Sequence, residues 1–230
     1  MRDLPRRTFT ALVYAGVVLL AALAPPTIFW ILLAVLGIVG LAELLRLRTG
    51  RSSLVLGGVF LAGLAGLGAL REMGALGARH GVADGLPVWL FLALLPTWVG
   101  DSVAYLVGST FGRRHLAPRI SPGKTWEGTL AGFLGCALAA LGVAAAFGLP
   151  RVPVAIVAMA LGPVGLAGDL LESYVKRRAG VKDSGSILPG HGGVLDRLDS
   201  LTAASTFVIV VLAIWSTTQL GSEGGLHERF

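Results

Sequence analysis

Charged residues and cysteines are scarce in this chain of 230 residues. Only 14% of the residues are Asp, Glu, Lys or Arg, whereas 54% are hydrophobic, and the mean hydropathy is +0.78. A soluble domain carries about 25% charged residues, so this composition excludes an ordinary soluble domain and predicts a polytopic membrane protein. The single cysteine, Cys136, excludes disulfides within the chain and any zinc site built from several cysteines.

Lysine is rarer than arginine, with three residues against sixteen. The net charge of +6 is compatible with nucleic acid, but the apolar runs leave no soluble basic domain, so we expect no nucleic-acid partner. Lys124, Lys176 and Lys182 all fall in two polar segments of the chain. Because a lysine ammonium binds phosphate as a compact point charge, this placement favours phosphate binding in both segments.

Seven apolar runs approach the length of about 20 residues that a membrane-spanning helix needs. We therefore expect an all-α bundle of about seven spans that forms a single membrane-embedded domain. The spans are predicted at residues 10–24, 27–45, 53–70, 87–107, 129–147, 152–171 and 201–220. The first is short and is followed by Pro25 and Pro26, so it forms either a tight hairpin with the second or a re-entrant segment.

Positive charge is distributed unevenly between the two sides of such a bundle. A cytoplasmic N-terminus places fifteen of the nineteen Lys and Arg residues on the cytoplasmic side, in segments 1–9, 46–52, 108–128 and 172–200. This bias is typical of cytoplasmic loops. We therefore expect a cytoplasmic N-terminus, with both polar segments facing the cytoplasm.

Acidic residues flank the last polar segment. Asp169 and Glu172 lie one helical turn apart at the end of the sixth span, and Asp196 and Asp199 repeat that spacing at the start of the seventh. Two carboxylate pairs at helix ends can converge on a cation, and hard oxygen ligands favour Mg²⁺ over zinc. Alternatively, Asp196 and Asp199 stabilise a helix dipole or pair with nearby cations.

Glycines and cations fill the same segment. The run Gly-His-Gly-Gly ends in His191, Gly192 and Gly193, and it lets backbone N–H groups approach an anion just ahead of a helix. A plain turn is the alternative, in which His191 only caps the turn. The cations that can neutralise a triphosphate and a departing pyrophosphate are Lys176, Arg177, Lys182 and Arg197.

The other polar segment follows the fourth span. Asp101 lies within that span, where an acid is a candidate functional residue or the buried partner of a cation. Ser121, Lys124 and Thr125 supply donors ahead of a helix, which suits a phosphate group. Glu127 follows directly after them.

Both segments resemble signatures of the phosphatidate cytidylyltransferases (CDP-diacylglycerol synthases). Residues 173–199 match the whole of one signature, which contains Lys-Arg, Lys-Asp, His-Gly-Gly and Asp-Arg-apolar-Asp elements. Residues 101–105 match Asp-x-x-Ala-Tyr, and residues 121–128 match Ser-Pro-x-Lys-Thr-Trp-Glu-Gly. The resemblance covers residues 95–200 closely. It implies N-terminal helices in residues 1–94, a catalytic region in residues 95–200 and a last span in residues 201–220.

The resemblance implies an enzyme of phospholipid biosynthesis in the cytoplasmic (inner) membrane, with its active site facing the cytoplasm. Its reaction would transfer CMP from CTP to phosphatidate and require Mg²⁺, with a second cation left open. By the same resemblance, Asp169 and Asp196 would bind metal, and the catalytic set would be Lys176, Lys182, Asp183, Arg197 and Asp199. The substrate-binding set would be Asp101, Ser121, Lys124, Thr125, Glu127, Arg177, His191, Gly192 and Gly193.

Other interpretations remain open at this point. A CTP-dependent polyprenol or phytol kinase would share the bundle and the nucleotide site, and a CDP-archaeol synthase would use an ether lipid. A transporter could place Asp101 and Asp169 on an ion path, although no internal repeat is visible. The many glycines in the spans are compatible with a homodimer. We expect Glu43, in the second span, to pair with Arg46 or Arg48.

Overall fold

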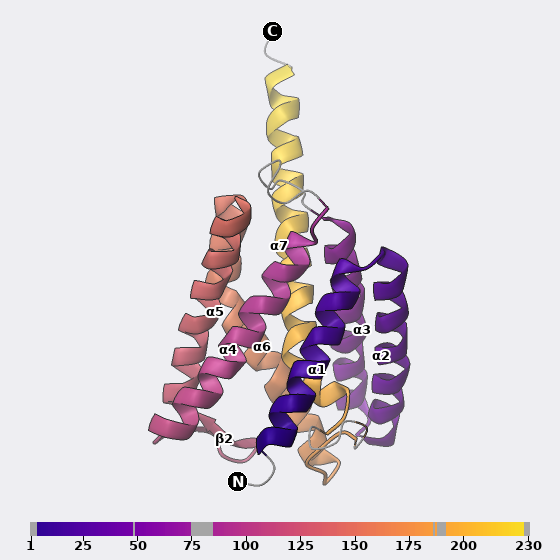
Figure 1. Cartoon of the computed structure of the whole chain (residues 1–230), viewed down its shortest axis with the longest axis vertical. Helices are drawn as coiled ribbons and strands as arrows, with labels where there is room; N and C mark the ends of the chain where they lie inside the picture. Colours follow the sequence, from indigo (N-terminus) through magenta and orange to yellow (C-terminus); the bar gives the residue numbers. More distant parts are fainter. Residues whose placement is uncertain (1–3, 48, 75–84, 186, 188–191, 228–230) are drawn as a thin grey trace.

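The computed structural model describes residues 4–47, 49–74, 85–185, 187 and 192–227, and the side chains from Val13 to Thr218 within them. These residues form seven helices and one two-stranded hairpin (Figure 1). In chain order the elements are α1 (Leu4–Leu23), α2 (Pro26–Leu47), α3 (Arg51–Glu72), α4 (Val88–Phe111), β1 (His115–Ala117), β2 (Ser121–Thr125), α5 (Trp126–Phe147), α6 (Arg151–Arg178) and α7 (Leu195–His227).

Six of the described helices are long and apolar enough to cross a membrane. They are α2 to α6 and the part of α7 from Leu195 to Thr218. Among the residues of α1 whose side chains are described, Val13–Leu23 form an apolar stretch. The expectation of an all-α polytopic membrane bundle is confirmed.

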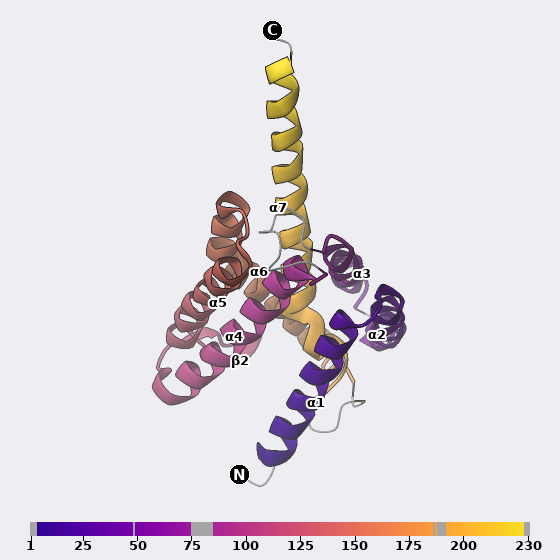
Figure 2. The same ribbon diagram turned by 45° about the horizontal axis from the view of Figure 1, so that its top comes forward.

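Successive helices run in opposite directions, so alternate connections gather at the same end of the bundle. In Figure 1 the start of α1, the β hairpin and the end of α6 all lie at the lower end. Helix α7 packs against both α6 and α3, and α4 packs along α5. Figure 2 shows that the C-terminal part of α7 extends beyond the other helices.

Glycines allow the helices around the centre to approach closely. A Cβ atom added to Gly128 of α5 would lie 2.6 Å from the carbonyl oxygen of Ala104 in α4. A Cβ atom on Gly168 of α6 would lie 2.6 Å from the carbonyl oxygen of Asp199 in α7. Small residues are typical of helix contacts in membranes, where packing rather than exclusion from water drives association.

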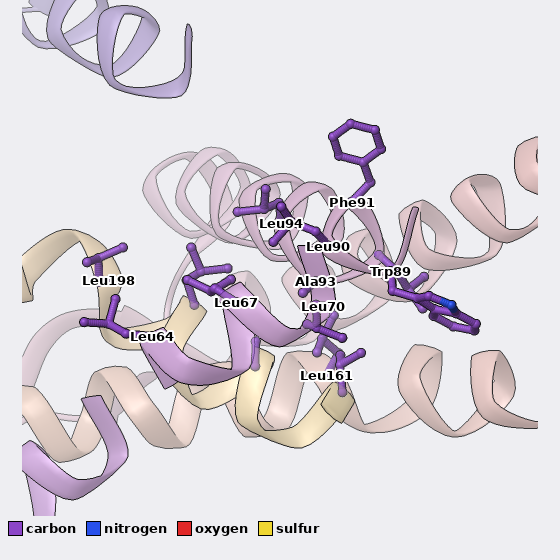
Figure 3. Packing of buried hydrophobic residues seen from close by; sticks show 14 of the residues in the cluster. Leu64, Leu67, Leu70, Trp89, Leu90, Phe91, Ala93, Leu94, Leu161 and Leu198 are labelled. Carbon is purple, nitrogen blue, oxygen red and sulfur yellow. The ribbon is translucent and has the colours of Figure 1, made fainter. Parts of the chain in front are cut away.

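The buried core draws residues from all seven helices, and Figure 3 shows the part of it where α3, α4, α6 and α7 meet. Its labelled members are Leu64, Leu67, Leu70, Trp89, Leu90, Phe91, Ala93, Leu94, Leu161 and Leu198. Large apolar side chains such as Leu134, Leu138 and Met159 are instead exposed on the outside of the bundle. That exposure is the expected state of a surface that faces lipid.

Helices α6 and α7 extend beyond the predicted spans. Helix α6 continues past residue 171 to Arg178, and α7 begins at Leu195, ahead of residue 201. Glu172 and Lys176 favour this extension, since both are good helix formers and they pair at i,i+4. The segment before α5, expected as a loop, contains the antiparallel β1–β2 hairpin.

Candidate active site

A cavity of about 460 Å³ lies among α4, β2, α5, α6 and α7. Its charged lining residues are Asp101, Lys124, Asp169, Lys176, Asp183, Asp196, Arg197 and Asp199. Its apolar lining continues between α4, α5 and α6 past Phe133, Cys136 and Leu161. One cavity therefore joins a charged region to an apolar region between membrane-spanning helices.

Lys176 lies at the centre of a buried charge cluster. Its Nζ atom is 2.8 Å from Oε2 of Glu172 and 2.5 Å from Oδ1 of Asp196. The three side chains are 10%, 1% and 6% exposed, respectively. One ammonium therefore compensates two buried carboxylates, and it ties the end of α6 to the start of α7.

Asp196 also organises the turn that leads into α7. Its Oδ2 atom accepts hydrogen bonds from the backbone N–H of Gly193 at 2.7 Å and of Ser184 at 3.0 Å. The Ser184 hydroxyl lies 3.1 Å from the same oxygen. Gly192 has φ of 80°, in the left-handed region that favours glycine, and a Cβ atom there would lie only 2.5 Å from Asp196 Oδ2. The glycines thus let this turn close around the Asp196 carboxylate.

A second ion pair joins β2 to α6. Lys124 forms a salt bridge with Asp169, which also accepts a hydrogen bond from the Ser173 hydroxyl at 3.3 Å. Burial lowers the pKa of Lys124, but the Asp169 carboxylate outweighs it and holds this pKa above its usual value. The Lys124 side chain therefore stays positively charged at the cavity wall. The carboxyl group of Asp101, which also lines the cavity, interacts electrostatically with it.

Glu43 of α2 is a buried acid whose role the sequence did not reveal. It is 1% exposed, and its carboxylate accepts hydrogen bonds from the backbone N–H groups of Val194 and Leu195, each at 3.0 Å. The expected pairing with Arg46 is wrong, and Arg48 lies outside the described residues. The sequence contained one indication of this role, because an acidic residue within an apolar span is a candidate functional residue.

The carboxylates suit a magnesium ion in their chemistry, although they do not form a ready-made metal centre. Among the described residues, no three His, Cys, Asp or Glu side chains group closely enough to enclose a metal. Mg²⁺ usually takes only one or two protein carboxylates and completes its shell with water and substrate phosphate. Oδ1 of Asp196 has Lys176 as its one described partner, and the buried Oε1 atom of Glu172 has none. Oxygen donors with free capacity are therefore present.

Comparison with known proteins identifies the family. The model of the Cytidylyltransferase family matches residues 76–215. The chain belongs to this family. The match includes every cavity-lining residue and both segments that carry the sequence resemblance.

Curated relatives in this family carry the name phosphatidate cytidylyltransferase. The protein of Haemophilus influenzae is 43% identical over 139 residues, and that of Bacillus subtilis is 43% identical over 134 residues. The protein of Brucella suis is 44% identical over 138 residues. These alignments cover 56%, 56% and 59% of this chain, and 46%, 48% and 49% of the relatives. The chain thus matches about half the length of each relative.

The structure brings most of the predicted site residues of this cytidylyltransferase-family chain to one place. Nine of them line the cavity: Asp101, Lys124, Thr125, Asp169, Lys176, Asp183, Asp196, Arg197 and Asp199. Gly192 and Gly193 lie beside them in the turn around Asp196. His191 lies outside the described residues.

Four predicted residues are described but do not line the cavity: Ser121, Glu127, Arg177 and Lys182. Glu127 accepts hydrogen bonds from the backbone N–H groups of Arg113 and Arg114, at 3.1 and 3.3 Å, and so fixes the start of the hairpin. Arg177 donates to the backbone carbonyl oxygens of Ile120 and Val181. These two residues thus hold the hairpin in place beside the cavity.

Proposed function

We propose that this chain transfers CMP from CTP to phosphatidate, giving CDP-diacylglycerol and pyrophosphate. The observation that carries the proposal is a cavity that joins a charged region to an apolar region between helices. A lipid phosphate needs cations for its headgroup and apolar helix surfaces for its acyl chains. The names of the relatives agree with this substrate class.

The chemistry requires charge neutralisation more than proton transfer. A phosphate oxygen of phosphatidate forms a bond to the α-phosphorus of CTP, the bond from that phosphorus to the β-phosphate oxygen breaks, and its electron pair leaves with pyrophosphate. The attacking oxygen is already anionic, so no base has to remove a proton from it. Positioned cations therefore supply the main stabilisation of the transition state.

The cavity suggests a division of these cations between the two substrates. Lys176 and Arg197 line it beside the turn at the start of α7 and would bind the triphosphate, with Lys182 approaching from the adjoining segment. Lys124 lines it from β2 and would bind the phosphate of phosphatidate, together with the hydroxyl of Thr125.

Carboxylates would complete the site. Asp169 and Asp196 would hold Mg²⁺, which when bound neutralises phosphate charge. Asp183 and Asp199 would orient the basic residues. The active site would face the cytoplasm, where CTP is found. The distribution of Lys and Arg supports this orientation, as does the position of α1's start at the same end of the bundle as the β hairpin.

The test uses the full chain in mixed micelles with phosphatidate and CTP labelled at the α- or γ-phosphate, with and without Mg²⁺. We expect Mg²⁺-dependent transfer of the α-label to lipid. Lys124→Gln and Asp196→Asn should lower this transfer at least about 100-fold. Arg178→Gln is the matched control, because Arg178 is an exposed cation at the end of α6 whose described contacts are Ser52 and Tyr174.

Three results would contradict the proposal. Transfer of the γ-label to an added lipid alcohol would indicate a lipid kinase. If Arg178→Gln and Lys124→Gln lose the same amount of transfer activity, the cavity-lining lysine matters no more for catalysis than an exposed cation does. If the folded protein transfers neither the α-label nor the γ-label, a transport function would explain the chain better than an enzyme would.

A further inference from the structure

Glu43 connects the N-terminal helices to the charged cavity. It lies on α2, outside residues 76–215 that the family model matches, yet its hydrogen bonds to described residues are with Ser184, Val194 and Leu195, in the segment at and before the start of α7. A carboxylate that is 1% exposed in an apolar bundle is costly unless donors compensate it. Its position thus requires that this segment lie against it.

Among the described residues, two backbone N–H groups and one hydroxyl shared with Asp196 compensate Glu43. The backbone N–H of Val194 donates to Oε1, the backbone N–H of Leu195 donates to Oε2, and the Ser184 hydroxyl lies 3.0 Å from Oε2. The first N–H groups of a helix have no partner within the helix, and a negative charge there also complements the helix dipole. Glu43 therefore caps α7 from another helix.

Ser184 links this cap to the charged cluster. Its hydroxyl lies between Oε2 of Glu43, at 3.0 Å, and Oδ2 of Asp196, at 3.1 Å. Asp196 in turn pairs with Lys176. A displacement of Glu43 is therefore transmitted through one hydroxyl and one helix terminus to two residues that line the cavity.

The glycines of the segment fit around the same carboxylate. A Cβ atom added to Gly185 or Gly193 would collide with the Glu43 side chain. The described backbone at Gly185 and at Gly193 is thus in direct contact with Glu43. A side chain at either position would displace the carboxylate or the backbone.

We propose that Glu43 is a positioning residue for the active site, acting through Ser184 and the first turn of α7 on Asp196 and Lys176. The catalytic part of this inference rests on the proposed function, whereas the structural part does not. It assigns the N-terminal helices a part in assembling the site.

The test compares Glu43→Gln with wild type in the full chain. Glutamine keeps the size but offers one acceptor oxygen in place of two, so at least one donor loses its partner. Hydrogen exchange of the Val194 and Leu195 amides should increase at least about tenfold. The kcat for transfer to phosphatidate should fall at least about tenfold, with KM for CTP within about threefold of wild type. Glu43→Asp should recover part of kcat.

Ser205→Ala is the matched control. It removes a buried hydrogen bond of 2.8 Å from α7 to the carbonyl oxygen of Gly63 in α3, away from the cavity. A comparable loss of kcat in Ser205→Ala would mean that Glu43 acts only through general stability, and it would overturn the inference. Unchanged amide exchange and kcat in Glu43→Gln would also overturn it.

Two further outcomes stay decisive. If the wild-type chain transfers no label, the proposed function fails, but amide exchange in Glu43→Gln still decides whether Glu43 holds the turn. If Glu43→Gln does not fold, Ser184→Ala removes only the hydroxyl link, and it should lower kcat with little change in KM. Wild-type kcat in Ser184→Ala would then overturn the inference.

Discussion

Replacement of Lys176 by methionine should destabilise the protein strongly. The Lys176 ammonium compensates Glu172 and Asp196, whose side chains are 1% and 6% exposed. Methionine fills similar space but leaves two buried carboxylates facing each other. Loss of one partner of a buried ion pair costs about 3–5 kcal/mol. For a chain of this size that corresponds to a decrease in Tm of roughly 6–20 °C.

Thermal unfolding in detergent micelles, followed by circular dichroism, measures this effect. Lys182→Met is the matched control, because Lys182 is an exposed lysine in the same polar segment and its loss should change stability by at most about 0.5 kcal/mol. The double variant Lys176→Met/Glu172→Gln should recover about 1–3 kcal/mol, since one of the two carboxylates is then neutral. A Tm for Lys176→Met equal to that of Lys182→Met, or no recovery in the double variant, would refute the reasoning.

Three other predictions concern packing, capping and charge. Gly168→Ala should lower the free energy of unfolding by about 1–3 kcal/mol, because the added Cβ atom would collide with the backbone of α7. Gly142→Ala should not destabilise the protein, because no atom lies within 4 Å of the added Cβ atom. Thermal unfolding of both variants tests this difference. Thr125→Val should cost about 1 kcal/mol because Thr125 caps the first turn of α5, and amide exchange there should increase. Since Asp169 raises the pKa of Lys124, the stabilisation by its ammonium is present below the ordinary lysine pKa and is lost only above the raised value. Asp169→Asn should therefore lower the pKa of Lys124, since burial then acts with less opposition; an unchanged Lys124 pKa, followed by NMR of the lysine ammonium across pH, would contradict this.

The spans were predictable from the sequence because a membrane helix needs a long apolar run. Their polar ends were not, because a helix does not have to be apolar to continue. Helix α6 runs on to Arg178 through residues that form helix well in water or at the membrane surface. The β hairpin was missed because strands of three and five residues containing Pro122 and Gly123 carry no alternating pattern.

The site was predictable where its contacts are local. The spacing of Asp169, Glu172 and Lys176 places them on one face of a helix. Asp169 and Lys176 line the cavity, and Glu172 pairs with Lys176 beside it. The pairs Lys124–Asp169 and Lys176–Asp196 depend instead on how β2, α6 and α7 pack, which no local rule gives. Metal binding and substrate contacts stay predictions.

Glu43 shows how a local rule can mislead. The pattern Glu–x–x–Arg suggested a pair on the surface of one helix. The observed partners of Glu43, Ser184, Val194 and Leu195, are more than 140 residues away in sequence. Only the packing of α2 beside the start of α7 brings Glu43 and these partners together. A hydropathy pattern does not predict which helices lie side by side.

The distance in sequence between Glu43 and its donors has a consequence for synthesis. A growing chain that has placed α1 to α6 in the membrane already contains the Glu43 carboxylate but not the backbone N–H groups of Val194 and Leu195. Until α7 arrives, that carboxylate needs water or other donors in place of these N–H groups. Arrival of α7 therefore supplies the cap, the second partner of Lys176 and the packing surface for α3 and α6 in one step. The cavity is therefore incomplete until α7 is synthesised, so a nascent chain that stops before α7 holds the lysines of the site without the turn that orders them.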